Sequence, residues 1–382
     1  MNIQLLNKIA AVGLNQLDDS YNVGENIENP DGIMVRSAVM HEMEFAPSLK
    51  AIARAGAGVN NIPIERCSES GIVVFNTPGA NANGVKELAI CALLLAARDV
   101  VGGIAWANTL TEDVAKQVEK GKSKFAGTEL MGKTLGVIGL GAIGGKIANT
   151  AIHLGMNVIG CDPFLSIEGA WNLNHRVSRA ATYDEVFEKS DYITLHVPAT
   201  KDTKNMICAE SIAKMKNGVK IINLSRADLV NAAELKAALT EGKVSAYVTD
   251  FPTEEVINTP GVVAIPHLGA STEESEDNCA VMAACELDDY LRNGNIKNSV
   301  NYPNVEMPRS GAARICVLHQ NVPSILTKIT AAVADEGLNI ENMTNKSKGE
   351  NAYTVLDVSS TPSDDAIARI SAVEGINRVR VI

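Results

Sequence analysis

The sequence predicts an α/β protein with two doubly wound parallel sheets and a small third domain. Short apolar runs alternate with helical patterns over residues 1–95, and the same alternation returns over 133–265. A glycine-rich turn at 139–144 joins an apolar run directly to a helical pattern. Residues 312–382 follow another order, which predicts a separate domain at the C-terminal end.

Composition limits the class of protein. The 382 residues suffice for two or three domains, and 46% hydrophobic with 21% charged residues is ordinary for a globular chain. No apolar run reaches the roughly 18 residues of a membrane span, and the N-terminus lacks a signal-peptide pattern. A net charge of −11 disfavours nonspecific nucleic-acid binding, and seven scattered cysteines predict reduced thiols without a disulfide or metal framework. We expect a cytoplasmic protein without nucleic-acid or membrane partners.

The glycine-rich turn has the sequence form of a dinucleotide-binding unit. An apolar run at 135–138 is followed by the glycines, a helical pattern at 146–154, a second apolar run at 156–160 and then Asp162. The glycines are Gly139, Gly141 and Gly144. They permit a tight turn, close approach of a pyrophosphate and close helix packing, while Asp162 can accept hydrogen bonds from ribose hydroxyls. A carboxylate there would repel a 2′-phosphate, so the expected cofactor is NAD. The competing interpretation is a structural glycine loop with Asp162 starting a turn.

The N-terminal segment predicts the first parallel sheet. Its expected strands are 3–6, 32–36, 50–55 and 72–75. Polar or glycine-rich loops follow the last three, and ligands bind beyond the carboxyl ends of strands in such sheets. A long apolar helix is expected at 85–106, and a polar linker rich in Lys and Gly at 116–128.

The second sheet continues past the glycine turn. Its further strands are expected at 191–196, 220–223, 245–250 and 262–265, with helices at 209–215 and 232–240 between them. A long amphipathic helix at 273–292 is expected to return the chain to the first domain. The predicted domains are therefore 1–95 with 285–305, which binds substrate, and 96–284, a Rossmann-type NAD domain.

Residues 312–382 predict the third domain. Strands are expected at 312–318, 339–345, 352–358 and 377–382, with helices at 324–336 and 364–372. This βαββαβ order is ferredoxin-like.

Three residues near expected strand ends suit one type of reaction. The imidazole of His267 titrates near neutral pH and can exchange a proton with a hydroxyl. A carboxylate at Glu255 could fix its tautomer, and Arg226 could bind a carboxylate bidentately. This combination predicts hydride transfer between NAD and a 2-hydroxy acid. From residue types alone, a capped loop histidine, a solvated glutamate and a surface arginine are the competing interpretation.

These residues lie within six motifs that together resemble the D-2-hydroxyacid dehydrogenase family. The motifs are Gly139–Gly144, Asp162-Pro163, His196–Pro198, Asn223–Arg226, Asp250 with Glu255, and Pro266–Thr272. The resemblance implies a flavodoxin-like substrate domain beside the Rossmann domain, and the catalytic residues Arg226, Glu255 and His267. Val256 stands where relatives have proline, so Glu254 stays open as the partner of His267. By the same resemblance, the residues that line NAD are Gly139, Gly141, Ala142, Ile143, Gly144, Asp162, Pro198, Thr203, Leu224, Ser225, Asp250, Gly269 and Ala270.

Within that family, residues 54–61, 76–78 and 266–272 resemble the members that act on D-3-phosphoglycerate. The resemblance implies NAD-dependent oxidation to 3-phosphohydroxypyruvate, the first step of L-serine synthesis. The expected substrate-binding residues are Arg36, Arg54, Gly58, Asn60, Thr77 and Lys86. Arg54 and Arg36 are expected to bind the phosphate, while Lys86 either assists them or is a solvated helix lysine. The alternatives are a reductase of hydroxypyruvate, glyoxylate or other 2-oxo acids, and an NAD-sensing corepressor-like binding protein.

The C-terminal domain carries a second resemblance. His319–Pro323 before a helix and 337–339 after it resemble an ACT domain. The resemblance implies an L-serine effector bound by His319, Asn321 and Asn339 at the junction of two chains, in a homodimer or homotetramer. Ser324 stands where the ACT family usually has glycine, so a purely structural dimerisation domain is the alternative.

Overall fold

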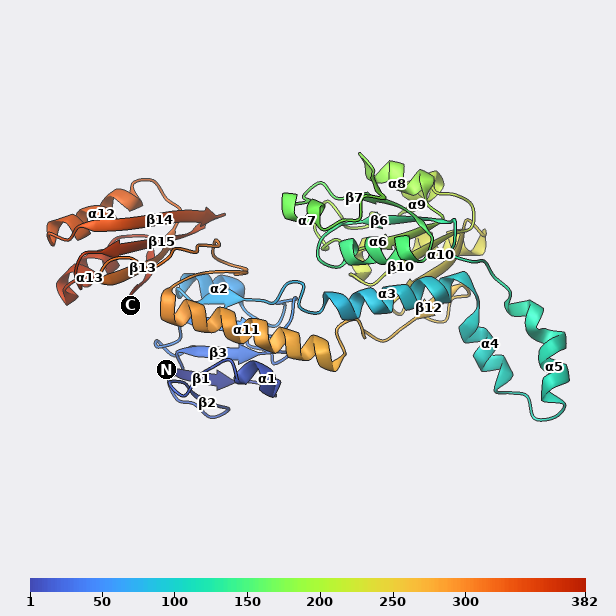
Figure 1. Ribbon diagram of the computed structural model, residues 1–382, viewed down its shortest axis with the longest axis horizontal. Helices are drawn as coiled ribbons and strands as arrows, with labels where there is room; N and C mark the ends of the chain where they lie inside the picture. The colour runs from blue at the N-terminus through green and yellow to red at the C-terminus, as the bar shows by residue number, and fades with distance from the viewer. The chain divides into compact units, whose positions relative to one another are not determined.

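The computed structural model describes residues 1–382 (Figure 1). Its contacts divide the chain into two compact units, one formed by residues 1–81 with 276–382 and the other by 82–275. We refer to them as unit 1 and unit 2 and describe each by itself.

Unit 1 begins with a parallel five-stranded sheet in the order β2-β1-β3-β4-β5, a flavodoxin-like order. The strands are β1 (Asn2–Leu5), β2 (Asn22–Gly24), β3 (Gly32–Val35), β4 (Ala51–Arg54) and β5 (Val73–Phe75). The four predicted strands are confirmed. The prediction missed β2, a three-residue edge strand with too few apolar positions to show a pattern.

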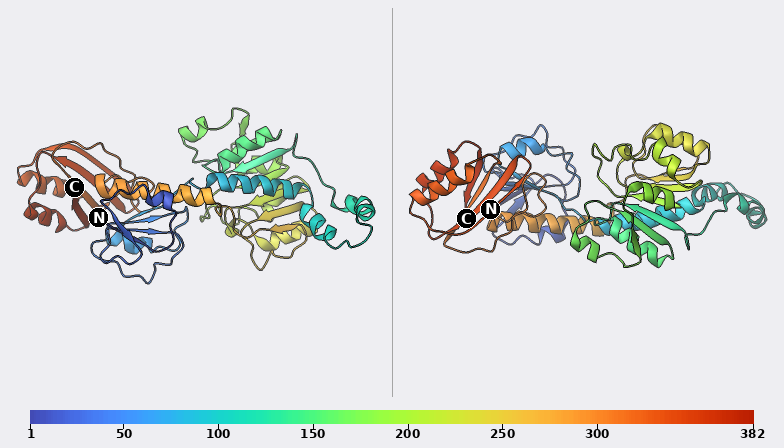
Figure 2. Two further views of the ribbon diagram at one scale, coloured as in Figure 1. Left: turned by 60° about the horizontal axis from the view of Figure 1, so that its bottom comes forward. Right: turned by 90° about the horizontal axis from the view of Figure 1, so that it is seen from above.

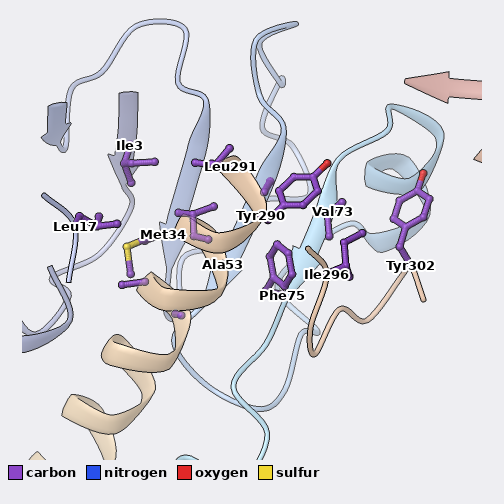
Figure 3. Close-up of a cluster of buried hydrophobic side chains, with 14 of the residues drawn as sticks. Ile3, Leu17, Met34, Ala53, Val73, Phe75, Tyr290, Leu291, Ile296 and Tyr302 are labelled. Atoms are coloured by element: carbon purple, nitrogen blue, oxygen red, sulfur yellow. The ribbon is translucent and has the colours of Figure 1, made fainter. Parts of the chain in front are cut away.

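Helices α1 (Ala11–Leu14), α2 (Ile64–Glu69) and α11 (Glu273–Asn293) accompany this sheet. Ile3 and Met34 of the strands share a buried core with Leu287 and Tyr290 of α11, and Phe75 stacks on Tyr290 with ring centroids 5.7 Å apart (Figure 3). Burying such side chains contributes roughly 1.5–3 kcal/mol each. Helix α11 therefore returns the chain to the first sheet, where its apolar side chains pack in the core.

Unit 2 contains a parallel seven-stranded sheet in the order β12-β11-β10-β9-β6-β7-β8. This is the Rossmann order extended by one strand, with the reversal between β6 and β9. The strands are β6 (Thr134–Ile138), β7 (Asn157–Cys161), β8 (Val177–Arg179), β9 (Tyr192–Leu195), β10 (Val219–Asn223), β11 (Val244–Thr249) and β12 (Val262–Ala264). The helices between them are α6 (Gly144–His153), α7 (Ile167–Trp171), α8 (Tyr183–Lys189), α9 (Ala209–Lys214), η2 (Ala227–Leu229) and α10 (Ala232–Thr240).

The segment between the sheets differs from the prediction. The expected single helix is two, α3 (Ala82–Ala97) and α4 (Val100–Ala107), because the side chain of Asp99 accepts a hydrogen bond from the Gly102 amide and starts a new helix. The predicted linker at 116–128 is wrong in part, since α5 (Val114–Gly121) and η1 (Lys122–Phe125) occupy most of it. None of the helices alone could cross a membrane; α3 and α4 reach that length only together and are bent by 72°.

The unit boundaries fall at other positions than the predicted domain boundaries. Helix α3 belongs to unit 2 because Val85, Ala89 and Leu93 pack in its core, although residues up to 95 were assigned to the substrate domain. Cys279 and Ala283 of α11 pack in unit 1 instead of the nucleotide domain. The roles assigned to these domains stay predictions.

The C-terminal part of unit 1 has the predicted order of elements. Strands β13 (Ala313–Gln320), β14 (Ile340–Lys348), β15 (Asn351–Val358) and β16 (Ile376–Val381) form an antiparallel sheet in the order β14-β15-β13-β16. Helices α12 (Ile325–Asp335) and α13 (Asp364–Ser371) cover one face of it (Figure 2). This arrangement is ferredoxin-like.

The other face of that sheet packs on the N-terminal sheet's core. Leu318 and Tyr353 belong to the same buried cluster as Tyr290. The buried guanidinium of Arg314 forms two bonds to Asp357, Nε–Oδ1 at 2.6 Å and Nη2–Oδ2 at 2.9 Å, and donates to the Asn293 carbonyl at the end of α11. The C-terminal sheet is therefore fixed to the first sheet by core contacts and by a buried ion pair.

Candidate active site

The glycine turn after β6 has the geometry of an anion cradle. A Cβ added at Gly139 would overlap the His196 carbonyl, and one at Gly144 would overlap the carbonyl oxygen of Gly139. A Cβ added at Gly141 would meet no atom within 4 Å. Two of the glycines are thus required for packing, and the third borders open space at the start of α6. That space beside a helix N-terminus fits a pyrophosphate.

Asp162 is held against the same turn. Its Oδ2 accepts a hydrogen bond from the Leu140 amide at 2.8 Å, and its Oδ1 accepts one from the Phe164 amide at 2.9 Å. These bonds fix the carboxylate at the end of β7, beside the glycine turn that follows β6. The placement suits the predicted contact with ribose hydroxyls.

The ends of β9 and β10 carry four more of the predicted cofactor residues. The Thr203 hydroxyl donates to the Pro198 carbonyl at 2.6 Å, and the Ser225 hydroxyl donates to the Leu195 carbonyl at 2.6 Å. Leu224 is buried between these loops. The loops are therefore shaped by their own hydrogen bonds at the point where the strand order reverses.

His196 follows β9 at this reversal, and the sequence predicts no role for its side chain. Burial lowers the pKa of its imidazole to about 3, so the ring is neutral at physiological pH. Nε2 is hydrogen-bonded to the Thr194 hydroxyl at 2.7 Å, while Nδ1 is buried without a partner. Its presence in the His-Val-Pro motif was the only signal that could have singled it out.

Two of the three predicted catalytic side chains meet beside one aromatic ring. The Phe251 ring lies 4.4 Å from the His267 ring between centroids, and the Arg226 Cζ lies 5.4 Å from the Phe251 centroid. These residues follow β11, β12 and β10 respectively. The strand ends therefore gather a guanidinium and an imidazole in one place.

Glu255 does not join them in this structure. Its side chain is exposed, forms no hydrogen bond with His267, and borders a cavity of about 300 Å³ that Thr253, Tyr247 and Phe251 also line. Glu254 is exposed as well and has no bond to His267. The choice between the two glutamates stays open.

Asp250 supplies the buried carboxylate near the pair. It is 1% exposed, and burial raises its pKa, while the positive charges of His267 and Arg226 and the Gly269 amide act in the opposite direction. Its Oδ1 has no hydrogen-bond partner. A buried orphan acceptor of this kind can receive a donor from a bound cofactor, as predicted for Asp250.

Unit 1 brings Arg36 and Arg54 together. Arg36 follows β3, Arg54 is the last residue of the adjacent β4, and the Arg54 Nε donates to the Arg36 carbonyl at 3.1 Å. The Arg36 guanidinium is 2.6 Å from the carboxylate of Glu276 on α11. This ion pair could not be predicted from the sequence, because it joins residues 240 positions apart.

The other predicted substrate residues are divided between the units. Gly58, Asn60 and the buried Thr77 lie in unit 1, in the loops after β4 and β5. Lys86 lies in unit 2, where its ammonium is 2.7 Å from the Asn83 side-chain oxygen and 3.6 Å from Glu87. These local bonds favour the interpretation of Lys86 as a helix-surface residue.

The predicted effector residues do not converge within one chain. His319 is 1% exposed and hydrogen-bonded to the Thr354 hydroxyl and the Gln320 carbonyl; burial lowers its pKa. His319 and Asn321 lie at one end of the sheet, whereas Asn339 precedes β14 at the other end. Ser324 has a φ of 66°, a left-handed conformation that glycine adopts more easily. An effector site that uses all three residues therefore needs a second chain.

No group of three or more His, Cys, Asp or Glu side chains could hold a metal ion. The site described above brings an imidazole, a guanidinium and a buried carboxylate close together in unit 2.

The comparisons with known proteins agree with this geometry. Residues 94–269 match the model "D-isomer specific 2-hydroxyacid dehydrogenase, NAD binding domain". A D-3-phosphoglycerate dehydrogenase of Escherichia coli is 32% identical over 350 residues, which cover 88% of this chain and 82% of that protein. One of Methanocaldococcus jannaschii is 36% identical over 324 residues, but they cover only 59% of its length against 82% of this chain.

A solved structure supports the same grouping. The NAD⁺-bound 3-phosphoglycerate dehydrogenase of Entamoeba histolytica is 31% identical, with a TM-score of 0.62 over 79% of this chain and 98% of that one. The chain spans little more than half the length of the D-3-phosphoglycerate dehydrogenases of Methanocaldococcus jannaschii and Archaeoglobus fulgidus, 59% and 52%, and most of the length of the E. coli protein. The chain therefore belongs to the D-isomer-specific 2-hydroxyacid dehydrogenase family, and unit 2 contains its NAD-binding domain.

Proposed function

We propose that the chain is a D-3-phosphoglycerate dehydrogenase, which oxidises D-3-phosphoglycerate to 3-phosphohydroxypyruvate with NAD as the oxidant in the first step of L-serine synthesis. The observation that carries the proposal is the placement of Arg36 and Arg54 at adjacent strand ends of unit 1. A substrate with a phosphate and a carboxylate needs two cationic sites, and Arg226 near His267 supplies the second. The names of the relatives support the same substrate.

The residues of unit 2 would hold the cofactor and move the proton. The nicotinamide of a bound NAD would supply the hydride acceptor for the carbon that carries the substrate hydroxyl. His267 takes the proton of that hydroxyl as a general base. Arg226 binds the substrate carboxylate and so orients the reacting carbon toward His267 and the cofactor site.

Glu255 would orient the imidazole. The structure contains no bond between Glu255 and His267, so this role requires the loop after β11 to move the carboxylate out of its cavity. Glu254 is the alternative partner, and substitution of each glutamate by Gln distinguishes them. The true partner's loss lowers kcat, and the other change leaves it within about twofold of the wild type.

The experiment that tests the function is steady-state NAD reduction, followed as NADH absorbance, with a panel of substrates. We expect turnover with D-3-phosphoglycerate at a kcat/KM at least tenfold above that with D-lactate, D-glycerate and glycolate. Similar values for all of these would contradict the proposal. NAD binding without turnover on any substrate, including the reverse reactions, would favour an NAD-sensing binding protein.

A reductase of hydroxypyruvate or glyoxylate is the second candidate. The observation that favours it is the ion pair between Arg36 and Glu276, which neutralises one of the two cations expected to bind phosphate. The reverse reaction separates the candidates: a phosphate-specific enzyme prefers 3-phosphohydroxypyruvate to hydroxypyruvate, and the alternative enzyme does not.

The C-terminal domain would be an ACT module that regulates or joins subunits. We propose that L-serine binds where His319 and Asn321 of one chain meet Asn339 of another, because these residues lie at opposite ends of the sheet. The expected result is inhibition by L-serine that Asn339→Ala weakens. Unchanged activity with serine in a protein that sediments as an oligomer would identify a structural domain instead.

We also propose a cytoplasmic protein that forms a homodimer or homotetramer. Helix α4 supports the oligomer, because none of its residues is buried, and Val100, Val101 and Ile104 are 43, 48 and 58% exposed. Apolar side chains on a whole helix usually meet a partner surface. Sedimentation velocity of the wild type and of Ile104→Glu tests this contribution.

A further inference from the structure

Phe251 contacts two side chains that the reaction needs. It directly follows Asp250 at the end of β11, and its half-buried ring lies 4.4 Å from the imidazole of His267 between centroids. The guanidinium of Arg226 lies over the same ring. The ring also lines the cavity that Glu255 borders. One aromatic side chain therefore contacts or adjoins every predicted catalytic residue of unit 2.

Neither side chain has another anchor within unit 2. The imidazole nitrogens of His267 form no hydrogen bond with the protein, since only its backbone carbonyl accepts one, from Ser271. The Arg226 side chain donates only to the carbonyl of its neighbour Ser225. The Phe251 ring and the Asp250 carboxylate, whose charge acts on both groups, are the neighbours that the two side chains share.

We propose that Phe251 is a positioning residue, whose ring holds the imidazole of His267 and the guanidinium of Arg226 at a fixed separation. The inference rests on the proposed function, in which Arg226 binds the substrate carboxylate and His267 takes the hydroxyl proton. Those two substrate groups are on adjacent carbons, so the two side chains must act at one small molecule. A rigid ring with two faces sets such a separation better than a flexible aliphatic side chain.

The test compares Phe251→Leu with Phe251→Tyr and with a matched control, Phe187→Leu, whose ring is buried in the core on another part of unit 2. Phe251→Leu is expected to lower kcat with D-3-phosphoglycerate roughly tenfold or more. KM for D-3-phosphoglycerate should change less than kcat, because the loss falls on the geometry of the reacting groups. Phe251→Tyr retains the ring and should restore kcat within about twofold. Phe187→Leu should lower the melting temperature and leave kcat nearly unchanged.

Nuclear magnetic resonance separates this inference from the proposed function. The protein has six histidines, and the spectrum of His267→Gln identifies the signal of residue 267. In the protein without substrate, Phe251→Leu should shift that signal through loss of the ring current. An unchanged signal would overturn the positioning role even if the enzyme is active. A shifted signal in a protein that turns over no phosphoglycerate would leave the contact in place and refute the proposed function instead.

Discussion

The proposed anion sites of the two units are built in different ways. In unit 2 the glycine turn presents backbone amides at the start of α6, and a side chain at Gly139 or Gly144 would overlap backbone. In unit 1 the cations are the side chains of Arg36 and Arg54, which lie at adjacent strand ends. A backbone cradle is fixed by the path of the chain, whereas a side-chain site depends on what else those side chains contact. Arg36 shows this dependence, because Glu276 already occupies its guanidinium.

The largest expected effect comes from the glycine turn. Gly144→Ala adds a methyl group that overlaps the Gly139 carbonyl, so the turn must open and both stability and NAD binding should be lost. Gly141→Ala adds its methyl group to open space. It should leave the melting temperature nearly unchanged and weaken NAD binding at least tenfold, because the methyl group occupies the proposed pyrophosphate position. Thermal unfolding and calorimetric NAD titration measure the two quantities.

Gly103→Ala is the control for an added methyl group, since this group would approach the Phe125 side chain no closer than 3.6 Å. It should leave NAD affinity unchanged and raise the melting temperature slightly, because Gly103 lies inside helix α4. Equal losses of NAD affinity and stability in Gly141→Ala would mean that the open space is part of the protein's own packing.

The next effect concerns what holds the substrate loop of unit 1. The Asn76 amide donates to the Asn298 carbonyl at 3.3 Å, and the Asn298 side chain donates to Glu286 on α11 at 2.6 Å. Burial raises the pKa of Glu286 from 4.5 to about 8, and its Oε2 has no partner. The turn of unit 2 is held by backbone hydrogen bonds and by the Asp162 carboxylate, whose Oδ2 accepts from the Leu140 amide at 2.8 Å.

Unit 1 should therefore lose stability as the pH rises. The folded state binds the Glu286 proton more tightly than the unfolded chain, so this stabilisation is complete below about pH 4.5 and is lost progressively up to about pH 8. The slope approaches about 1.4 kcal/mol per pH unit, a total of a few kcal/mol. Hydrogen exchange of α11 reports unit 1, while tryptophan fluorescence reports unit 2, where Trp106 and Trp171 both lie. In Glu286→Gln the slope for α11 should flatten; an equal slope in that variant would refute the assignment.

The sequence predicted what is encoded locally. Alternating apolar runs gave both parallel sheets, and glycine spacing with Asp162 gave the cradle, because these features depend on neighbours within a few dozen residues. It missed the ion pair of Arg36 with Glu276 and the contact of Phe251 with His267. These contacts join loops from distant strands, and residue types alone do not say which side chains will meet. The expected linker at 116–128 was wrong because its polar composition also suits exposed helices.

A smaller effect is expected for the side-chain site itself. Arg54→Gln removes one cation from the proposed phosphate site and should raise KM for D-3-phosphoglycerate by about 10- to 100-fold, the range of a charge-assisted bond. KM for hydroxypyruvate, which lacks the phosphate, should rise less than threefold. Arg54→Lys keeps the charge, so its KM for D-3-phosphoglycerate should lie between those of the wild type and Arg54→Gln. Equal losses with the phosphorylated and unphosphorylated substrates would remove Arg54 from the phosphate site.

The smallest effect separates the two kinds of anion site most directly. Glu276 competes with a substrate phosphate for the Arg36 guanidinium, and both side chains are about 40% exposed, so the pair contributes little to stability. Glu276→Gln frees the guanidinium and should lower KM for D-3-phosphoglycerate about threefold, with the melting temperature nearly unchanged. KM for NAD should not change, because the glycine turn binds through backbone amides in unit 2. The KM values for both substrates, measured at low and high salt, check this, since the gain should shrink as salt screens the exposed charges. A KM that stays the same for the phosphorylated substrate would show that Arg36 contributes no binding energy to the phosphate and leave Arg54 as the residue to account for it.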